Sequence, residues 1–248
     1  MRSRYPSPST LAYSFGPGPL TPAIKAIVIA NVAAFLVSWM VPSIILVFGL
    51  SPSDTVVRLH LWQPLTYMFL HEGIFHILFN MLALWMFGVE LERTWGSQYF
   101  LKFYFVCGVG AAMTTVVLSF LPGAFGQQLY YSLTIGASGA VFGVLLAYAL
   151  YFPNRPIYMY MVFPIPAKYF VAIMGAISLL SSMGGPGGIA HTTHLGGLVA
   201  GYLYLKGGRM HPLAELRYQY ARWRIGRMRR RFDVHAGGRS SNVNRRVH

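Results

Sequence analysis

Long apolar stretches, separated by short polar or glycine-rich segments, dominate the hydrophobic pattern of this chain. A helix needs roughly 17 to 25 mostly apolar residues to cross the ~30 Å hydrocarbon layer of a membrane. The pattern predicts six helices of this kind, near residues 22–41, 74–91, 99–120, 136–152, 165–182 and 190–206. We therefore predict an all-α membrane protein built as a bundle of six transmembrane helices.

The predicted membrane domain occupies residues 21–206, between a Pro-, Gly- and Ser-rich N-terminal segment (1–20) and a basic tail (207–248). We expect the N-terminal segment to be disordered. It lacks the compact apolar core of a cleavable signal peptide, so we expect the first helix to be the insertion signal. Residues 42–73 mix apolar and aromatic residues with isolated polar ones, a pattern typical of a segment lying in the membrane interface. The single cysteine, Cys107, is expected to be a small core residue.

Composition supports the membrane interpretation, and charge predicts the orientation. Hydrophobic residues make up 55% of the chain and charged residues 10%, which is more apolar surface than one soluble core needs. Lys and Arg near membrane helices remain on the cytoplasmic side. With both termini inside, every basic residue except Arg58 is cytoplasmic.

The basic tail contributes most of the formal net charge of +14. Its run "RYQYARWRIGRMRRRF" follows directly after a predicted membrane helix. We interpret this run as an anchor on anionic lipid or as a solvated tail, rather than as a nucleic-acid binding segment.

Four polar side chains at predicted membrane depth are candidates for function, because such groups are costly there. They are His76 and Asn80 in the second helix, Ser138 at the start of the fourth and His194 in the sixth. His76 and Asn80 are four residues apart, so they share one helical face. Taken alone, this pair is explained equally well by two buried groups that satisfy hydrogen bonds and by a functional site.

Glycines surround Ser138 and repeat after His194 with the same G-x-x-x-G spacing: Gly136, Gly139 and Gly143, and then Gly197 and Gly201. Alone, such spacing indicates a helix-packing groove. If the two helices pack through these glycines, His194 approaches Ser138, and a neutral imidazole can accept the serine proton. The pattern predicts a catalytic Ser-His dyad. His76, Asn80 and the backbone N–H of Ser138, near the positive end of a helix dipole, are candidate donors to an oxyanion.

A metal site is the weaker interpretation of the histidines. His71 and His76 in "HEGIFH" are five residues apart, whereas a zinc H-E-x-x-H motif needs four. On one helix, the second ring would point about 140° away from the first. His191 and His194 are three apart, but no carboxylate or thiol lies nearby in the sequence. We therefore expect neither a metal nor a cofactor.

Over residues 22–206, the chain resembles the rhomboid family of intramembrane serine proteases. The resemblance rests on "HILFN", "ELERTWGS", "GASG" and "AHTTHLGGLVAG", in this order along the predicted helices. It implies that Ser138 is the nucleophile and His194 the general base. It further implies that the side chains of His76 and Asn80 bind the oxyanion.

Other matched positions imply supporting roles. By resemblance, Glu92 is structural and ties the cytoplasmic end of the second helix to the loop that follows. Trp62 matches the aromatic anchor of the first loop, but Gln63 stands where some members have Arg, so no role of that Arg is carried over. Phe142 stands where a well-studied member has Tyr, and it keeps a ring for packing on His194 without the phenol hydroxyl.

The expected function is cleavage of transmembrane or juxtamembrane segments of membrane proteins. We expect the protein in the bacterial inner membrane, with the site facing the non-cytoplasmic side, and expect the glycine-rich loop at 181–189 and the fifth helix to move to admit substrate. One alternative is an inactive rhomboid-like protein that binds membrane clients, although such proteins usually lack the Ser or the His. Another is a transporter with a His-Asn proton relay, although neither an inverted repeat nor a buried acid supports it.

Overall fold

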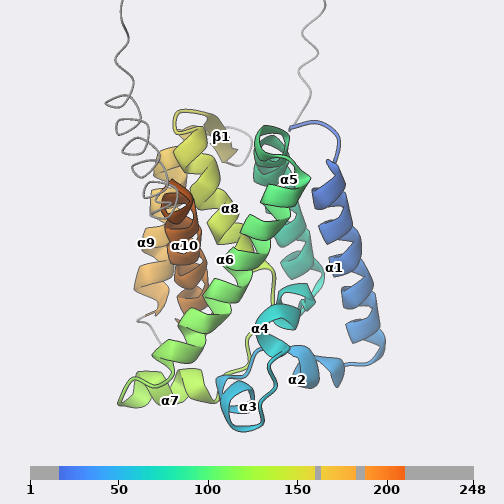
Figure 1. The fold of residues 1–248 in the computed structure, drawn as a ribbon, viewed down its shortest axis with the longest axis vertical. Helices are drawn as coiled ribbons and strands as arrows, with labels where there is room; N and C mark the ends of the chain where they lie inside the picture. Colours follow the sequence, from blue (N-terminus) through green and yellow to red (C-terminus); the bar gives the residue numbers. More distant parts are fainter. Residues whose placement is uncertain (1–16, 160–162, 183–187, 210–248) are drawn as a thin grey trace, which may run out of the picture. The chain divides into compact units, whose positions relative to one another are not determined.

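The computed structural model describes residues 17–159, 163–182 and 188–209, and these ranges are largely helical (Figure 1). The longer helices are α1 (Pro22–Met40), α5 (Ile74–Trp95), α6 (Ser97–Leu118), α8 (Ser138–Tyr151), α9 (Ala167–Ser182) and α10 (Gly188–Arg209). Each lies on one predicted apolar stretch, with bounds that differ by a few residues. Three of the described helices, α1, α5 and α6, are long and apolar enough to cross a membrane. The helices α8 and α9 are apolar but shorter.

Several predictions fall on residues outside the described ranges. Most of the predicted disordered segment (1–16), the centre of the glycine-rich loop (183–187) and nearly all of the basic tail (210–248) are among them. The predicted domain bounds therefore stay predictions.

Helix α6 is central to the packing of residues up to Leu205. It packs most extensively against α8 and also contacts α5 and α1. Figure 1 shows these helices side by side. Large aromatic side chains on and near α6 are fully buried in this core: Tyr67, Phe100, Phe103 and Tyr104. Cys107 is also buried and free, which confirms its prediction as a core residue.

The outer faces of α1 and α5 expose large apolar side chains. Trp39 is 77% exposed, Ile74 71% and Phe75 72%. Contiguous apolar surface of this kind is unfavourable in water, so these faces suit a lipid solvent.

The segment between α1 and α5 folds into short helices: α2 (Ile44–Phe48), α3 (Pro52–Val57), α4 (Gln63–Thr66) and the 3-10 helix η1 (Tyr67–Phe69). They gather at the same end of the bundle as α7 (Ala124–Tyr130) (Figure 1). Val57, Leu59 and Leu61 are exposed, while Gln63 and Tyr67 are fully buried. The segment therefore has an apolar outer surface, as predicted, and a polar residue inside.

A short β-hairpin corrects the prediction of an all-α fold. Strands β1 (Pro156–Met159) and β2 (Phe163–Pro166) pair antiparallel between α8 and α9, with Ile157 opposite Ile165. Three prolines lie in the pair, at 156, 164 and 166. Proline cannot donate a backbone hydrogen bond and disfavours helix interiors, so this connection leaves the helical state.

Candidate active site

Ser138 is the first residue of α8, and backbone hydrogen bonds hold the segment that precedes it. Thr134 and Leu50 exchange backbone bonds of 2.9 and 2.8 Å. The N–H of Gly136 donates to the carbonyl oxygen of Tyr67 at 2.9 Å. Gly136 has φ +123°, a conformation that residues with a side chain rarely adopt. This turn delivers Ser138 to the N-terminus of a helix, where backbone N–H groups lack intrahelical acceptors.

Ser138 and His194 come together across 56 residues of sequence. The Oγ of Ser138 lies 2.8 Å from the Nε2 of His194. The Nδ1 of His194 has no hydrogen-bond partner within the described ranges. Phe142 stacks on the imidazole, with ring centroids 4.3 Å apart and planes 8° apart. The geometry permits the serine proton to pass to His194, while Phe142 fixes the plane of the ring.

Glycine contacts allow this approach of α8 and α10. A Cβ at Gly197 would collide with the carbonyl oxygen of Gly139. A Cβ at Gly201 would lie 3.2 Å from the Cα of Gly143. The two helices therefore touch backbone to backbone through the glycines that the spacing predicted.

A hydroxyl pair adds a second constraint on α10. The hydroxyls of Thr193 and Thr115 lie 2.8 Å apart in the buried contact between α10 and α6. This bond comes one residue before His194, so it helps to set the rotation of α10.

His76 lies close to Gly136, on the side of the glycine that Ser138 also faces. A Cβ at Gly136 would be 2.8 Å from the Nε2 of His76 and 3.6 Å from the Oγ of Ser138. The backbone N–H of Glu72 donates to the Nδ1 of His76 at 3.4 Å. This bond favours the tautomer with a proton on Nε2, so His76 can donate toward the space beside Ser138.

Asn80 is buried one turn after His76. Its Nδ2 donates to the backbone oxygen of His76 at 2.9 Å. This amide nitrogen carries a second hydrogen, which is the one that could serve an oxyanion.

Glu92 is buried at the other end of α5 and joins three elements. Its carboxylate accepts backbone bonds from Ala23 at 2.9 Å and Ile24 at 3.0 Å, and the Thr21 hydroxyl also donates to it. Ser97, on the next helix, donates to it at 2.6 Å. Glu92 thus joins the start of α6 to α1, and it caps the free N–H groups of α1, which the sequence did not indicate.

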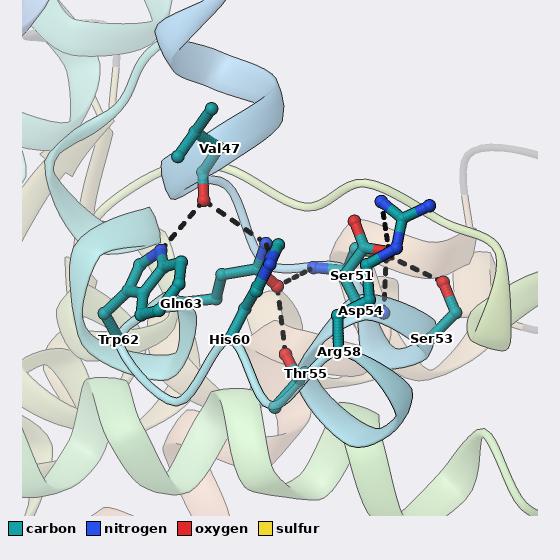
Figure 2. A network of polar contacts seen from close by, with 9 residues as sticks. All are labelled: Val47, Ser51, Ser53, Asp54, Thr55, Arg58, His60, Trp62 and Gln63. Atoms are coloured by element: carbon teal, nitrogen blue, oxygen red, sulfur yellow. Dashed lines mark hydrogen bonds and ion pairs between the residues drawn. The ribbon is translucent and has the colours of Figure 1, made fainter.

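Trp62 lies away from the dyad, in the segment between α1 and α5. Its Nε1 donates to the carbonyl oxygen of Val47 at 3.0 Å, and its ring stacks on His60 with centroids 4.6 Å apart (Figure 2). Its position therefore fits an anchor of that segment rather than a group at the reacting atoms.

The expectation that the rings of His71 and His76 point away from each other is wrong. The two ring centroids lie 4.9 Å apart, edge to face. The expectation assumed one helix, but α5 begins only at Ile74, so His71 precedes it. His71 is buried, and burial lowers the pKa of its imidazole to about 4, with a further contribution from His76.

No group of three or more His, Cys, Asp or Glu side chains able to hold a metal ion lies within the described residues. His191 is instead a neighbour of His194, edge to face with centroids 5.5 Å apart. This closeness follows from their spacing of three residues on one helix.

Sequence reasoning missed Gln63 and Tyr67 as parts of the surroundings of Ser138. Tyr67 holds Gly136 through its backbone and donates its hydroxyl to the Gly108 carbonyl at 2.7 Å. The available signal was the isolated amide in "LWQPLTY", because a polar residue within an apolar run must find partners if it is buried.

Comparisons with known proteins match one family over much of the chain. The model of the Rhomboid domain family matches residues 58–209. Rhomboid protease GluP of Bacillus subtilis (strain 168) is 32% identical over 157 residues, which are 62% of this chain and 27% of that protein. Rhomboid protein 1, mitochondrial, of Saccharomyces cerevisiae is 31% identical over 138 residues, which are 55% of this chain and 38% of that protein.

Rhomboid protease AarA of Providencia stuartii is 27% identical over 153 residues, which are 57% of this chain and 54% of that protein. The matched region thus covers between 27% and 54% of the length of these three relatives.

Proposed function

Because this chain belongs to the rhomboid family, we propose that it is an intramembrane serine endopeptidase that cleaves transmembrane or juxtamembrane segments of other membrane proteins. Its membership of the rhomboid family and its long apolar helices together show that the chain is an integral membrane protein. The observation that carries the proposed chemistry is the 2.8 Å separation between Ser138 Oγ and His194 Nε2.

The proposed reaction proceeds through an acyl-enzyme. Ser138 Oγ attacks the scissile carbonyl carbon as its proton passes to His194 Nε2. The carbon–nitrogen bond then breaks, and the imidazolium returns the proton to the leaving amine. Water then attacks the ester carbonyl as its proton passes to His194. The carbon–oxygen bond to Ser138 breaks, and the imidazolium returns the proton to Ser138 Oγ, which releases the free carboxyl end.

The tetrahedral intermediate needs donors for its oxyanion. The N–H of Ser138, the Nε2–H of His76 and the Nδ2 of Asn80 are the proposed donors. The closeness of both His76 Nε2 and Ser138 Oγ to Gly136 supports this assignment. Loss of one such donor typically lowers turnover by about 100-fold to 1,000-fold.

The proposal includes six membrane crossings with both termini in the cytoplasm of a bacterium and the site on the non-cytoplasmic side. The charge asymmetry supports this orientation, since Arg58 alone among the basic residues then lies outside. The basic tail would lie on anionic lipid of the cytoplasmic leaflet.

Substrate entry is proposed to require movement of α9 and of the 181–189 loop away from α5. The Phe87 and Phe170 rings stack across the contact between α5 and α9, with centroids 6.2 Å apart. A reducible bis-thiol cross-linker that joins these helices through Phe87→Cys and Phe170→Cys, in a Cys107→Ala background, is expected to block cleavage of a membrane substrate until it is reduced. Cleavage undiminished by the cross-link contradicts the gate.

The direct test reconstitutes the protein in vesicles with a reporter transmembrane substrate. Ser138→Ala and His194→Ala are each expected to abolish cleavage. Ser119→Ala is the matched control, because that buried hydroxyl donates to the nearby Val116 carbonyl at 2.7 Å and lies outside the proposed site. Cleavage that survives Ser138→Ala contradicts the dyad, and cleavage abolished by chelators would favour a metal enzyme instead.

A further inference from the structure

Gln63 is a fully buried amide at the start of α4. Its Oε1 accepts from the Ser51 N–H at 3.1 Å and from the Thr55 hydroxyl at 3.0 Å. Its Nε2 donates to the Val47 carbonyl at 3.3 Å and lies 3.4 Å from His60 Nδ1. Figure 2 shows this one side chain at the centre of the contacts that join α2, α3 and α4.

The network needs a side chain that both donates and accepts. An amide has two donor hydrogens and an acceptor oxygen, whereas a guanidinium only donates and a carboxylate only accepts. Because Gln63 is buried, loss of its acceptor deprives the Ser51 N–H of its described partner, and loss of its donor leaves the Val47 carbonyl with the Trp62 Nε1–H alone. The amide of Gln63 therefore supplies both the donor and the acceptor that its neighbours need.

Two connections lead from Gln63 to the segment before Ser138. The first runs through Ser51, whose preceding residue Leu50 exchanges backbone bonds with Thr134. In the second, the N–H of Tyr67 donates to the backbone oxygen of Gln63. Tyr67 in turn accepts from Gly136 at 2.9 Å. Both connections end within four residues of the serine.

We propose that Gln63 is a positioning residue for Ser138, acting through Leu50 and Tyr67 on the turn at residues 134–136. This inference rests on the proposed protease function. Gln63 touches neither Ser138 nor His194 through any described contact; it fixes where the N–H and Oγ of Ser138 lie relative to His76. A shift of about 1 Å in such a group can lower the rate about 100-fold.

The test measures how fast a fluorophosphonate labels Ser138 in the full-length protein, per folded molecule. Gln63→Glu keeps an acceptor but turns an oxygen toward the Val47 carbonyl, and Gln63→Met removes both functions. Each is expected to slow labelling about 10- to 100-fold. Thr55→Val removes one donor at nearly constant volume and is expected to slow it several-fold. Arg58→Gln is the control, because it removes an ion pair with Asp54 in the same segment, made by a largely exposed guanidinium, and leaves the Gln63 contacts in place.

Two further measurements separate positioning from stability alone. The variants are expected to lower kcat with little change in KM, and amide hydrogen exchange at residues 134–136 is expected to accelerate. If the folded Thr55→Val and Gln63 variants are labelled at Ser138 as fast as the wild type, the positioning role of Gln63 is overturned. If neither Gln63 variant folds, Thr55→Val decides it. Wild type that labels no faster than Ser138→Ala contradicts the protease proposal itself, and this inference with it.

Discussion

At the scale of single residues, Gly136 lies beside two groups proposed to act on the substrate carbonyl, His76 and Ser138. Its φ of +123° and the nearness of His76 Nε2 leave no room for a side chain. A Cβ there would lie 2.8 Å from the Nε2 of His76 and 3.6 Å from the Oγ of Ser138, the two side-chain atoms that act on the substrate carbonyl in the proposed mechanism. Glycine is therefore needed here for volume as well as for backbone conformation.

Gly136→Ala is expected to reduce substrate cleavage by about 100-fold or more, because its Cβ would displace a proposed oxyanion donor. The matched control is Gly123→Ala. Gly123 has φ +96°, but a Cβ there would meet no atom of the described residues within 4 Å. Both variants should unfold more easily, by roughly 1 to 2 kcal/mol of backbone strain. Equal cleavage by the two variants would show that strain alone matters.

His71 predicts an acid sensitivity of folding. Its pKa falls to about 4 in the folded protein, chiefly through burial, against about 6.5 in an unfolded chain. Between these values the unfolded chain binds more protons, so stability decreases as the pH falls from about 6.5 to 4, by up to about 1.4 kcal/mol per pH unit. Two other titratable groups lie next to His71: His76, whose ring packs edge to face with it, and Glu72, the following residue in the chain.

Thermal unfolding in detergent between pH 7 and pH 5 measures this effect. The free energy of unfolding should fall less steeply with acid in His71→Leu than in wild type. Identical slopes in the two proteins would contradict the role given to His71.

At the scale of elements, the contact of α8 with α10 decides whether the dyad forms. The helices meet at glycines, so the 2.8 Å separation between Ser138 and His194 depends on the backbones touching. Small residues are the usual means by which membrane helices approach so closely, because burial from lipid supplies little hydrophobic driving force.

Gly197→Ala is expected to abolish most cleavage, because its Cβ collides with the Gly139 carbonyl and must push α10 away from α8. Gly207→Ala, further along α10, adds the same methyl group where no described atom lies within 4 Å. We expect this control to cleave at the wild-type rate. Fluorophosphonate labelling and reporter cleavage, measured together, check both variants; wild-type activity of Gly197→Ala would refute the close-packing argument.

At the scale of the whole molecule, the positive charge gathers at one end of the sequence. Ten arginines follow residue 209. Basic residues near an anionic membrane surface contribute about 1 kcal/mol each at low salt, within the range of a Debye length.

Trypsin digestion tests the proposed lipid contact of the tail. In vesicles with the tail outward, phosphatidylglycerol should slow tail cleavage relative to phosphatidylcholine. The difference should vanish in about 1 M salt, where the Debye length is about 3 Å. Equal digestion rates in both lipids at low salt would contradict the contact.

How much of this molecule can be predicted from its sequence depends on how local the signal is. The positions of the helices can be predicted from the lengths of the apolar stretches. The close approach of α8 to α10 can be predicted from the spacing of the glycines on each. The burial of Gln63 and the contact of His71 with His76 depend on how the segment between α1 and α5 folds back. The β-hairpin depends on prolines whose effect on a short connection is ambiguous in sequence.

His194 lies on α10, which follows every other described helix in the chain, and this order bears on biosynthesis. When the ribosome has produced α8, Ser138 is already in place but has no base, because its partner is 56 residues away. On the proposed mechanism, a nascent or truncated chain lacking α10 is inert toward the membrane proteins around it. Proteolytic capacity would then arise only as the last described helix inserts, so translation itself delays activity until the rest of the bundle is built.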